Sequence, residues 1–148
     1  MTHILVTNDD GILAPWIIQL AKSLTQLGKV TVLASDKNWS VSGHKKTLHK
    51  PLRVRRVDLI NGVDTFSSDG TPSDCVAIAL LGFIEEKIDL VVSGINPHAN
   101  IGNTSPILVL LLLPSKLPFL GYLQLHFHWI LLKIILAIWT IQLLVKSP

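Results

Sequence analysis

The sequence predicts an α/β fold for residues 1–103, with a doubly wound, Rossmann-like, mostly parallel sheet, followed by an atypical apolar C-terminal tail. Short apolar runs alternate with a segment of helical periodicity, which is typical of a parallel sheet covered by helices. Short connections between these segments favour right-handed crossovers. Polar turns follow the apolar runs, so ligand-binding chemistry is expected where the strands end.

The first elements form a strand–helix–strand unit. Residues 3–7 (HILVT) are a short apolar run and predict a buried strand. After the turn NDDG, Pro15 is placed to open a helix. Apolar positions of residues 16–28 recur at helical spacing, with Gly28 as the expected C-cap. Residues 29–35 (KVTVLAS) predict a second buried strand.

The remaining elements before residue 103 continue the α/β pattern. Residues 52–59 and 64–68 predict a hairpin or a pair of edge strands. The next helix begins at GTPSD, where Thr71 is the expected N-cap and Asp74 completes a capping pattern. Residues 89–94 predict a third buried strand.

Residues 104–148 do not continue this alternation, and their composition differs. All ten Asp and Glu residues precede residue 90, and the only Lys or Arg residues after residue 103 are Lys116, Lys133 and Lys146. The net charge of +3 therefore reflects a missing acidic half rather than a basic surface, and we expect no nucleic-acid binding. On its own, the apolar run is long enough for a tail anchor that spans a bilayer.

Cysteine content and the N-terminus bear on the compartment. The single Cys75 excludes an internal disulfide framework, so a reducing compartment is expected. The first residues have no basic start and no cleavage site, and do not predict a signal peptide. We therefore expect a cytoplasmic protein.

Two adjacent carboxylates, Asp9 and Asp10, follow the first predicted strand directly. Such a pair repels itself unless a cation or a shared proton compensates it, and Mg²⁺ or Mn²⁺ suits this role. The alternative is an ordinary turn in which an Asp caps the next helix. The metal interpretation is favoured because neutral oxygen donors follow the other two buried strands at the same expected edge of the sheet, among them Ser40, Ser42, Asn96 and Asn100.

The motifs ILVTNDDGILAP, NWS, GTPSDCV and VVSGIN resemble the successive signatures of the SurE family (survival protein E) across residues 1–103. Members of that family are metal-dependent 5'/3'-nucleotidases and acid phosphatases that act on nucleoside monophosphates. The resemblance implies one divalent ion, Mg²⁺ or Mn²⁺, whose ligands are Asp9, Asp10, Ser40 and Asn96. It implies that the phosphate is bordered by Asn8, Ser42, Gly94 and Asn100. The implied catalytic pair is Asp9 and Asp10, with Asp9 orienting or deprotonating the attacking water.

The resemblance also gives an interpretation of residues 104–148. The family continues with a segment like TYSGTVxAAxE and then GIPxIAxS, and neither is visible here. Codons for the tail can be chosen so that the same DNA, read one base out of frame, encodes TYSGTVAAAIEAT and GIPAIAFSLD. We therefore interpret the tail as out-of-frame translation after loss of one base near the codon for Thr104. Residues 1–103 then form an incomplete phosphatase domain.

Three functional hypotheses remain. The first is a metal-dependent phosphomonoesterase that hydrolyses nucleoside monophosphates to nucleoside and phosphate. The second is a catalytically silent relative with a partial metal or nucleotide site, which the missing YSGT segment favours. The third is a membrane protein attached only through the apolar tail. Family resemblance further implies a homo-oligomer, formed through later parts of the chain that are not recognisable here.

Overall fold

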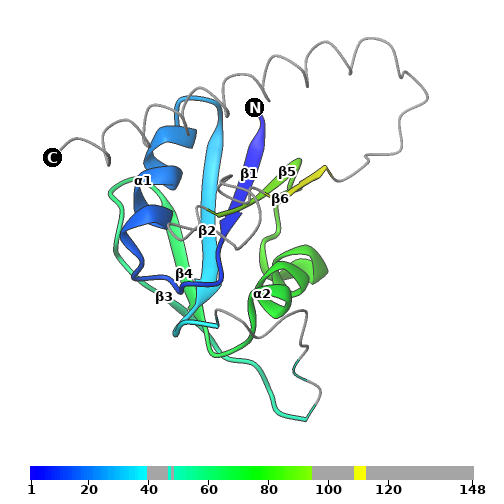
Figure 1. Ribbon diagram of the computed structural model, residues 1–148. Coiled ribbons are helices and arrows are strands. Elements are labelled where there is room, and N and C mark those ends of the chain that lie inside the picture. The colour runs from blue at the N-terminus through cyan, green and yellow to red at the C-terminus, as the bar shows by residue number, and fades with distance from the viewer. Residues whose placement is uncertain (40–46, 48, 95–108, 113–148) are drawn as a thin grey trace, which may run out of the picture.

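The structure is a computed structural model that describes residues 1–39, 47, 49–94 and 109–112. The described strands form one sheet in the order β3-β4-β2-β1-β5-β6 (Figure 1). They are β1 (His3–Thr7), β2 (Lys29–Ser35), β3 (Val54–Arg56), β4 (Asp64–Ser68), β5 (Leu90–Ser93) and β6 (Val109–Leu112). The helices are α1 (Pro15–Leu24) and α2 (Pro72–Ile78), and a wider π-type segment, η1 (Ala79–Phe83), continues α2.

The centre of the sheet is parallel, which confirms the predicted α/β, mostly parallel architecture. β1 pairs in parallel with β2 and β5, and β2 pairs in parallel with β4. β3 and β6 are antiparallel to β4 and β5, respectively. The chain runs outward from β1 through β2 to β4 and then crosses to β5 on the other side of β1. This reversal creates the topological switch point of a doubly wound sheet, between β1 and β5.

Both faces of the central strand β1 are covered. Ile4 and Val6 pack in the same cluster as Leu20 of α1. On the opposite face, Leu5 packs in the same cluster as Cys75 of α2. Because successive side chains of a strand point to opposite faces, a strand covered on both sides must be apolar along its length. This explains why the apolar runs 3–7 and 29–35 coincide with β1 and β2.

The start of α2 confirms the predicted capping pattern. The Thr71 hydroxyl accepts a hydrogen bond from the backbone N–H of Asp74 at 3.2 Å. In return, the Asp74 carboxylate accepts one from the backbone N–H of Thr71 at 2.9 Å. The two bonds form a capping box that satisfies N–H groups at the helix start, while Pro72 occupies the first helical position.

The end of α1 differs from the prediction. The helix begins at Pro15 as expected, but it ends at Leu24 with Thr25 as the C-cap, so the assignment of Gly28 as C-cap is wrong. A Cβ on residue 28 would lie 2.1 Å from the backbone oxygen of Thr2. Gly28 is therefore required by the close approach of two chain segments, not by the helix end.

Of the two antiparallel edge strands, the sequence predicts one and misses the other. β3 and β4 confirm the predicted pairing of residues 52–59 with 64–68. β6 lies in the segment after residue 103, for which the sequence predicted no strand. Its apolar residues pair with β5, whose edge would otherwise present unpaired backbone groups. The apolar run from residue 113 onward lies outside the described residues, and none of the helices that the structure describes is long and apolar enough to cross a membrane.

Candidate metal and phosphate site

The loops after β1, β2 and β5 meet at one edge of the sheet, because parallel strands share the direction in which they end. The backbone N–H of Trp39 donates to the carbonyl oxygen of Asp9 at 2.7 Å, joining the loop after β2 to the loop after β1. The N–H of Gly94 donates to the carbonyl oxygen of Thr7 at 3.1 Å, which holds the start of the loop after β5 against the end of β1. Asn8, Asp9 and Gly94 thus flank the topological switch point.

The side chain of Asn8 closes the turn that carries the carboxylates. Its Oδ1 accepts a hydrogen bond from the N–H of Gly11 at 3.1 Å, and the residue is 1% exposed. Its Nδ2 is buried and has no hydrogen-bond partner among the residues described. A buried donor of this kind marks a position where a bound oxygen would satisfy it.

Gly11 lets this turn lie against the loop after β2. Its φ angle is +96°, a conformation that favours glycine. A Cβ there would lie 3.1 Å from the carbonyl carbon of Lys37. The next residue, Ile12, donates its N–H to the carbonyl oxygen of Ser35 at 2.8 Å. The loop that presents Asp9 and Asp10 is therefore fixed to its neighbour by backbone contacts.

The two carboxylates are not used to cap α1. The N-cap is Ala14, which makes no side-chain capping bond, and the first turn of the helix has no acidic residue. The alternative in which an Asp of this turn caps the helix is therefore wrong. Asp9 and Asp10 are both half-buried, and Oδ1 of Asp10 accepts a bond from Nδ2 of Asn38 at 3.4 Å. Adjacent, partly desolvated carboxylates are suited to bind a cation.

Half of the predicted site is described. Gly94 is buried with φ +144°, and together with Asn8, Asp9 and Asp10 it lies at the switch-point edge. The other predicted site residues lie outside the described residues: Ser40, Ser42, Asn96 and Asn100. Within the described ranges, no group of three or more His, Cys, Asp or Glu residues could hold a metal. The two carboxylates would therefore need neutral oxygen donors to complete a shell, which is the chemistry expected of Ser40 and Asn96.

Asp74 also makes a long-range contact that the sequence does not predict. Besides Thr71, its carboxylate accepts the backbone N–H of Thr47, at 3.2 Å from each oxygen. Burial raises the pKa of this carboxyl, but hydrogen bonds from Thr47 and Thr71 outweigh burial and hold the pKa below its usual value. The contact joins positions 27 residues apart, so a local sequence pattern cannot predict it.

Comparison with known proteins agrees with this fold. The family model described as "Survival protein SurE" matches residues 4–107. A 5'-nucleotidase SurE of Herpetosiphon aurantiacus is 50% identical over 101 residues, covering 68% of this chain and 40% of that protein. One from Legionella pneumophila (strain Lens) is 54% identical over 100 residues, covering 68% and 38%.

A solved structure supports the same relationship. The crystal structure of a SurE protein from Aquifex aeolicus has a TM-score of 0.58 and 42% sequence identity, and the match covers 68% of this chain and 40% of that one. The chain thus spans about 40% of the length of these relatives. Sequence, strand arrangement and family match together show that this chain belongs to the SurE family.

Proposed function

We propose that the chain carries the N-terminal part of a metal-dependent phosphomonoesterase that hydrolyses nucleoside monophosphates to nucleoside and phosphate. The observation that carries the proposal is the position of Asp9 and Asp10 at the switch point between β1 and β5, where neither residue caps α1. The names of the relatives, 5'-nucleotidase SurE, support the reaction class. One divalent ion, Mg²⁺ or Mn²⁺, is the proposed cofactor because the donors are hard oxygen atoms.

The proposed roles follow the family resemblance and the described contacts. The metal ligands are Asp9, Asp10, Ser40 and Asn96, and the phosphate is bordered by Asn8, Ser42, Gly94 and Asn100. When bound, the divalent ion supplies charge neutralisation of the phosphate and a bound water of lowered pKa. Asp9 would orient the attacking water or accept its proton. The buried Nδ2 of Asn8 supports the phosphate role, because it offers a donor to a phosphate oxygen.

A cysteine nucleophile does not fit this chain. Cys75 is the single cysteine, and it is fully buried between the sheet and α2. Burial raises the pKa of its thiol to about 12, so the nucleophilic thiolate is scarce at neutral pH. Phosphate transfer to Cys75 is therefore disfavoured, whereas attack by water at Asp9 and Asp10 needs no such nucleophile.

The test uses the full chain with AMP and with p-nitrophenyl phosphate as substrates. We expect hydrolysis with Mn²⁺, none with EDTA, and loss of activity in Asp9→Ala. Asp58→Ala is the matched control, because the Asp58 side chain is 100% exposed in the β3–β4 connection, away from the switch point. Activity retained in Asp9→Ala would remove the proposed metal centre.

The second candidate is a catalytically silent relative that keeps partial metal or nucleotide binding. It is favoured by the fact that the chain spans about 40% of the length of its relatives. Calorimetry with Mn²⁺ separates the two candidates: binding that depends on Asp9 without any turnover of AMP supports the silent relative. Family-type homo-oligomerisation is tested on the same sample by light scattering.

The nature of residues 104–148 stays a prediction. A base lost near the codon for Thr104 is tested by sequencing the gene, and an intact frame incompatible with the hidden codons would contradict it. The cytoplasmic location is proposed from the single, buried Cys75. Membrane association through the apolar tail is the alternative, and resistance to carbonate extraction would support it.

A further inference from the structure

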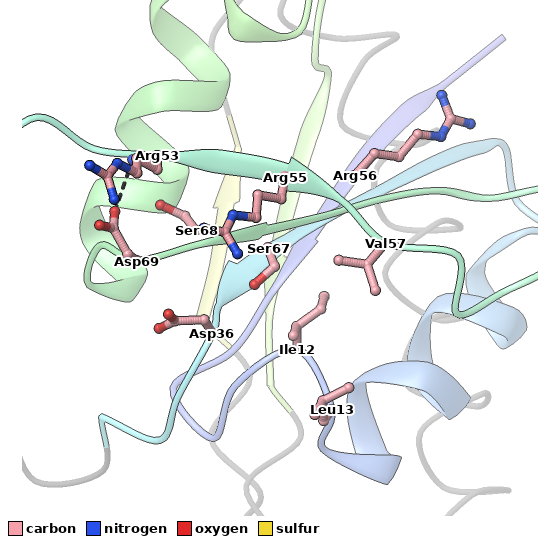
Figure 2. Close-up of a pocket in the computed structure, with 10 residues that line it drawn as sticks. All are labelled: Ile12, Leu13, Asp36, Arg53, Arg55, Arg56, Val57, Ser67, Ser68 and Asp69. Atoms are coloured by element: carbon pink, nitrogen blue, oxygen red, sulfur yellow. Dashed lines mark hydrogen bonds between the residues drawn. The ribbon is translucent and has the colours of Figure 1, made fainter.

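A pocket separate from the carboxylate pair lies between the β3–β4 edge and the loop that leads into α1 (Figure 2). Its volume is about 520 Å³, within the range of roughly 300–1,000 Å³ that is usual for small-molecule sites. One part of its wall is apolar and comes from Ile12, Leu13 and Val57. Another part is polar and includes Arg55 and Ser67.

The register of the sheet explains why Arg55 and Ser67 meet here. They are direct partners in the antiparallel β3–β4 pair, and Ser67 is in turn the partner of Ala34 in β2. Partners in register point to the same face. Ala34 packs in the core cluster that contains α1, so Arg55 and Ser67 lie on that same face, further toward the sheet edge. The pocket lies on this outer part of the face.

The charges around the pocket differ in whether they are already paired. Nη2 of Arg56 lies 2.8 Å from Oδ1 of Asp64, and Asp69 accepts bonds from the Arg53 backbone and from Lys50. Arg55 is exposed, and its guanidinium has no hydrogen-bond or ion-pair partner in the part of the chain that the structure describes.

Side-chain directions agree with this difference. In Figure 2 the side chains of Arg55 and Ser67 point toward the space above Ile12, whereas Arg56 extends away from it. The carboxylate of Asp36, which also lines the pocket, is turned away from Arg55. An unpaired guanidinium beside a hydroxyl and an apolar surface is suited to a ligand that has both an oxyanion and an apolar body.

We propose that this pocket binds an organic phosphate about the size of a nucleoside monophosphate. Its phosphate lies against Arg55 and Ser67, and its apolar part lies against Ile12, Leu13 and Val57. A guanidinium presents paired donors that match two phosphate oxygens. The site goes beyond the proposed hydrolase, because binding here requires neither a metal nor turnover. Ile12 and Leu13 continue the loop of Asp9 and Asp10, so a bound ligand would also hold that loop in place.

The experiment titrates the full chain with AMP, adenosine and inorganic phosphate by calorimetry in EDTA. EDTA removes divalent ions, so the result does not depend on the proposed metal centre or on hydrolysis. We expect AMP to bind at least about tenfold more tightly than adenosine or phosphate alone, because only AMP meets both parts of the wall. Arg55→Gln should weaken AMP binding by about tenfold or more, and Arg55→Lys should weaken it less.

Lys22→Gln is the control, because it removes one positive charge from the exposed side of α1, outside the pocket. It should leave AMP affinity unchanged. Thermal melting verifies that each variant folds, and Ser67→Ala serves as a second pocket variant if Arg55→Gln does not. The proposal is overturned if AMP does not bind, if the pocket variants bind AMP as the wild type does, or if Lys22→Gln weakens binding equally.

Discussion

Two strand-to-helix turns at the same edge of the sheet use their carboxylates in opposite ways. In the turn from β4 to α2, Asp74 accepts backbone N–H groups from Thr71 and Thr47, and Thr71 caps the helix. In the turn from β1 to α1, the N-cap Ala14 makes no side-chain capping bond, and two carboxylates precede it. Both turns follow parallel strands, so the difference comes from the turns themselves.

The difference shows how surroundings decide what an acidic residue does. A carboxylate that faces several N–H groups is stabilised as an anion and contributes to folding. Two neighbouring carboxylates repel each other, and a cation relieves that repulsion. The turn from β1 to α1 therefore has the chemistry of a cation-binding site, and the turn from β4 to α2 has a structural role. Substitutions in the two turns test this difference, because those at Asp9 should affect activity and those at Asp74 should affect stability.

The largest expected effect is on activity. Asp9→Asn should lower Mn²⁺-dependent hydrolysis of AMP by at least about a hundredfold, because the metal contributes several kcal/mol to the transition state. In EDTA the same substitution should not lower thermal stability, since it removes a like charge beside Asp10. Rates and melting temperatures are measured on the same samples. An Asp9→Asn variant that keeps full activity but melts early would reverse the roles assigned to the two turns.

The next effect is on stability. Asp74→Asn should lower the free energy of unfolding by about 2 kcal/mol, because an amide replaces a buried carboxylate that accepts charge-assisted hydrogen bonds. Urea unfolding at pH 7 measures it. Asp58→Asn, at a fully exposed side chain, should change stability little. Equal destabilisation by both substitutions would mean that the capping box and the Thr47 contact contribute nothing specific.

The same residue predicts a pH dependence. The pKa of Asp74 is lower in the folded chain than its usual value, so the folded state favours the carboxylate. Its stabilising contribution is complete above the unfolded pKa of about 3.9 and is lost as the pH falls through the lower folded value. The stability difference between wild type and Asp74→Asn should therefore shrink below about pH 4. Urea unfolding at pH 7, 5, 4 and 3 tests this, and a constant difference would contradict it.

Some of this comparison could be predicted from the sequence, because it rests on local patterns. β1 and β2 have the predicted bounds, since burial on both faces requires an unbroken apolar run. The capping box at Thr71 lies within four residues and has a recognisable order of side chains. The carboxylate pair is recognisable in the sequence because it directly follows a strand, where parallel sheets bind ligands.

Other features depend on segments that meet only in the folded chain. The bond from Thr47 to Asp74 is one, and the meeting of Arg55 with the Ile12 loop is another. Arg55 belongs to the basic run LHKPLRVRR (residues 48–56), a pattern typical of a solvated strand face. Its sequence neighbours do not indicate that a pocket lies between this strand and the Ile12 loop. Gly28 was misassigned because glycine serves both helix ends and close backbone approaches, and only the position of Thr2 distinguishes them.

The smallest expected effect tests the missing cap of α1. Ala14 has φ −62° and ψ 130°, the extended conformation of an N-cap, but no side-chain oxygen. Ala14→Ser supplies an acceptor for an N–H of the first turn and should raise the free energy of unfolding by about 0.5–1 kcal/mol. Thr71→Ala at α2 is the opposite change and should lower it by about 1 kcal/mol. Urea unfolding at pH 7 measures both.

Ala14→Ser adds no charge near Asp9 and Asp10, so hydrolysis should be unchanged. If the substitution fails to stabilise the chain while Thr71→Ala destabilises it, the first-turn N–H groups of α1 are already satisfied in the folded protein, and the contrast between the two turns would not hold. If Ala14→Ser stabilises the chain without altering activity, the stability of α1 and catalysis are independent at this position. A neutral cap then serves the helix better, and ligand binding remains as the role of the two carboxylates.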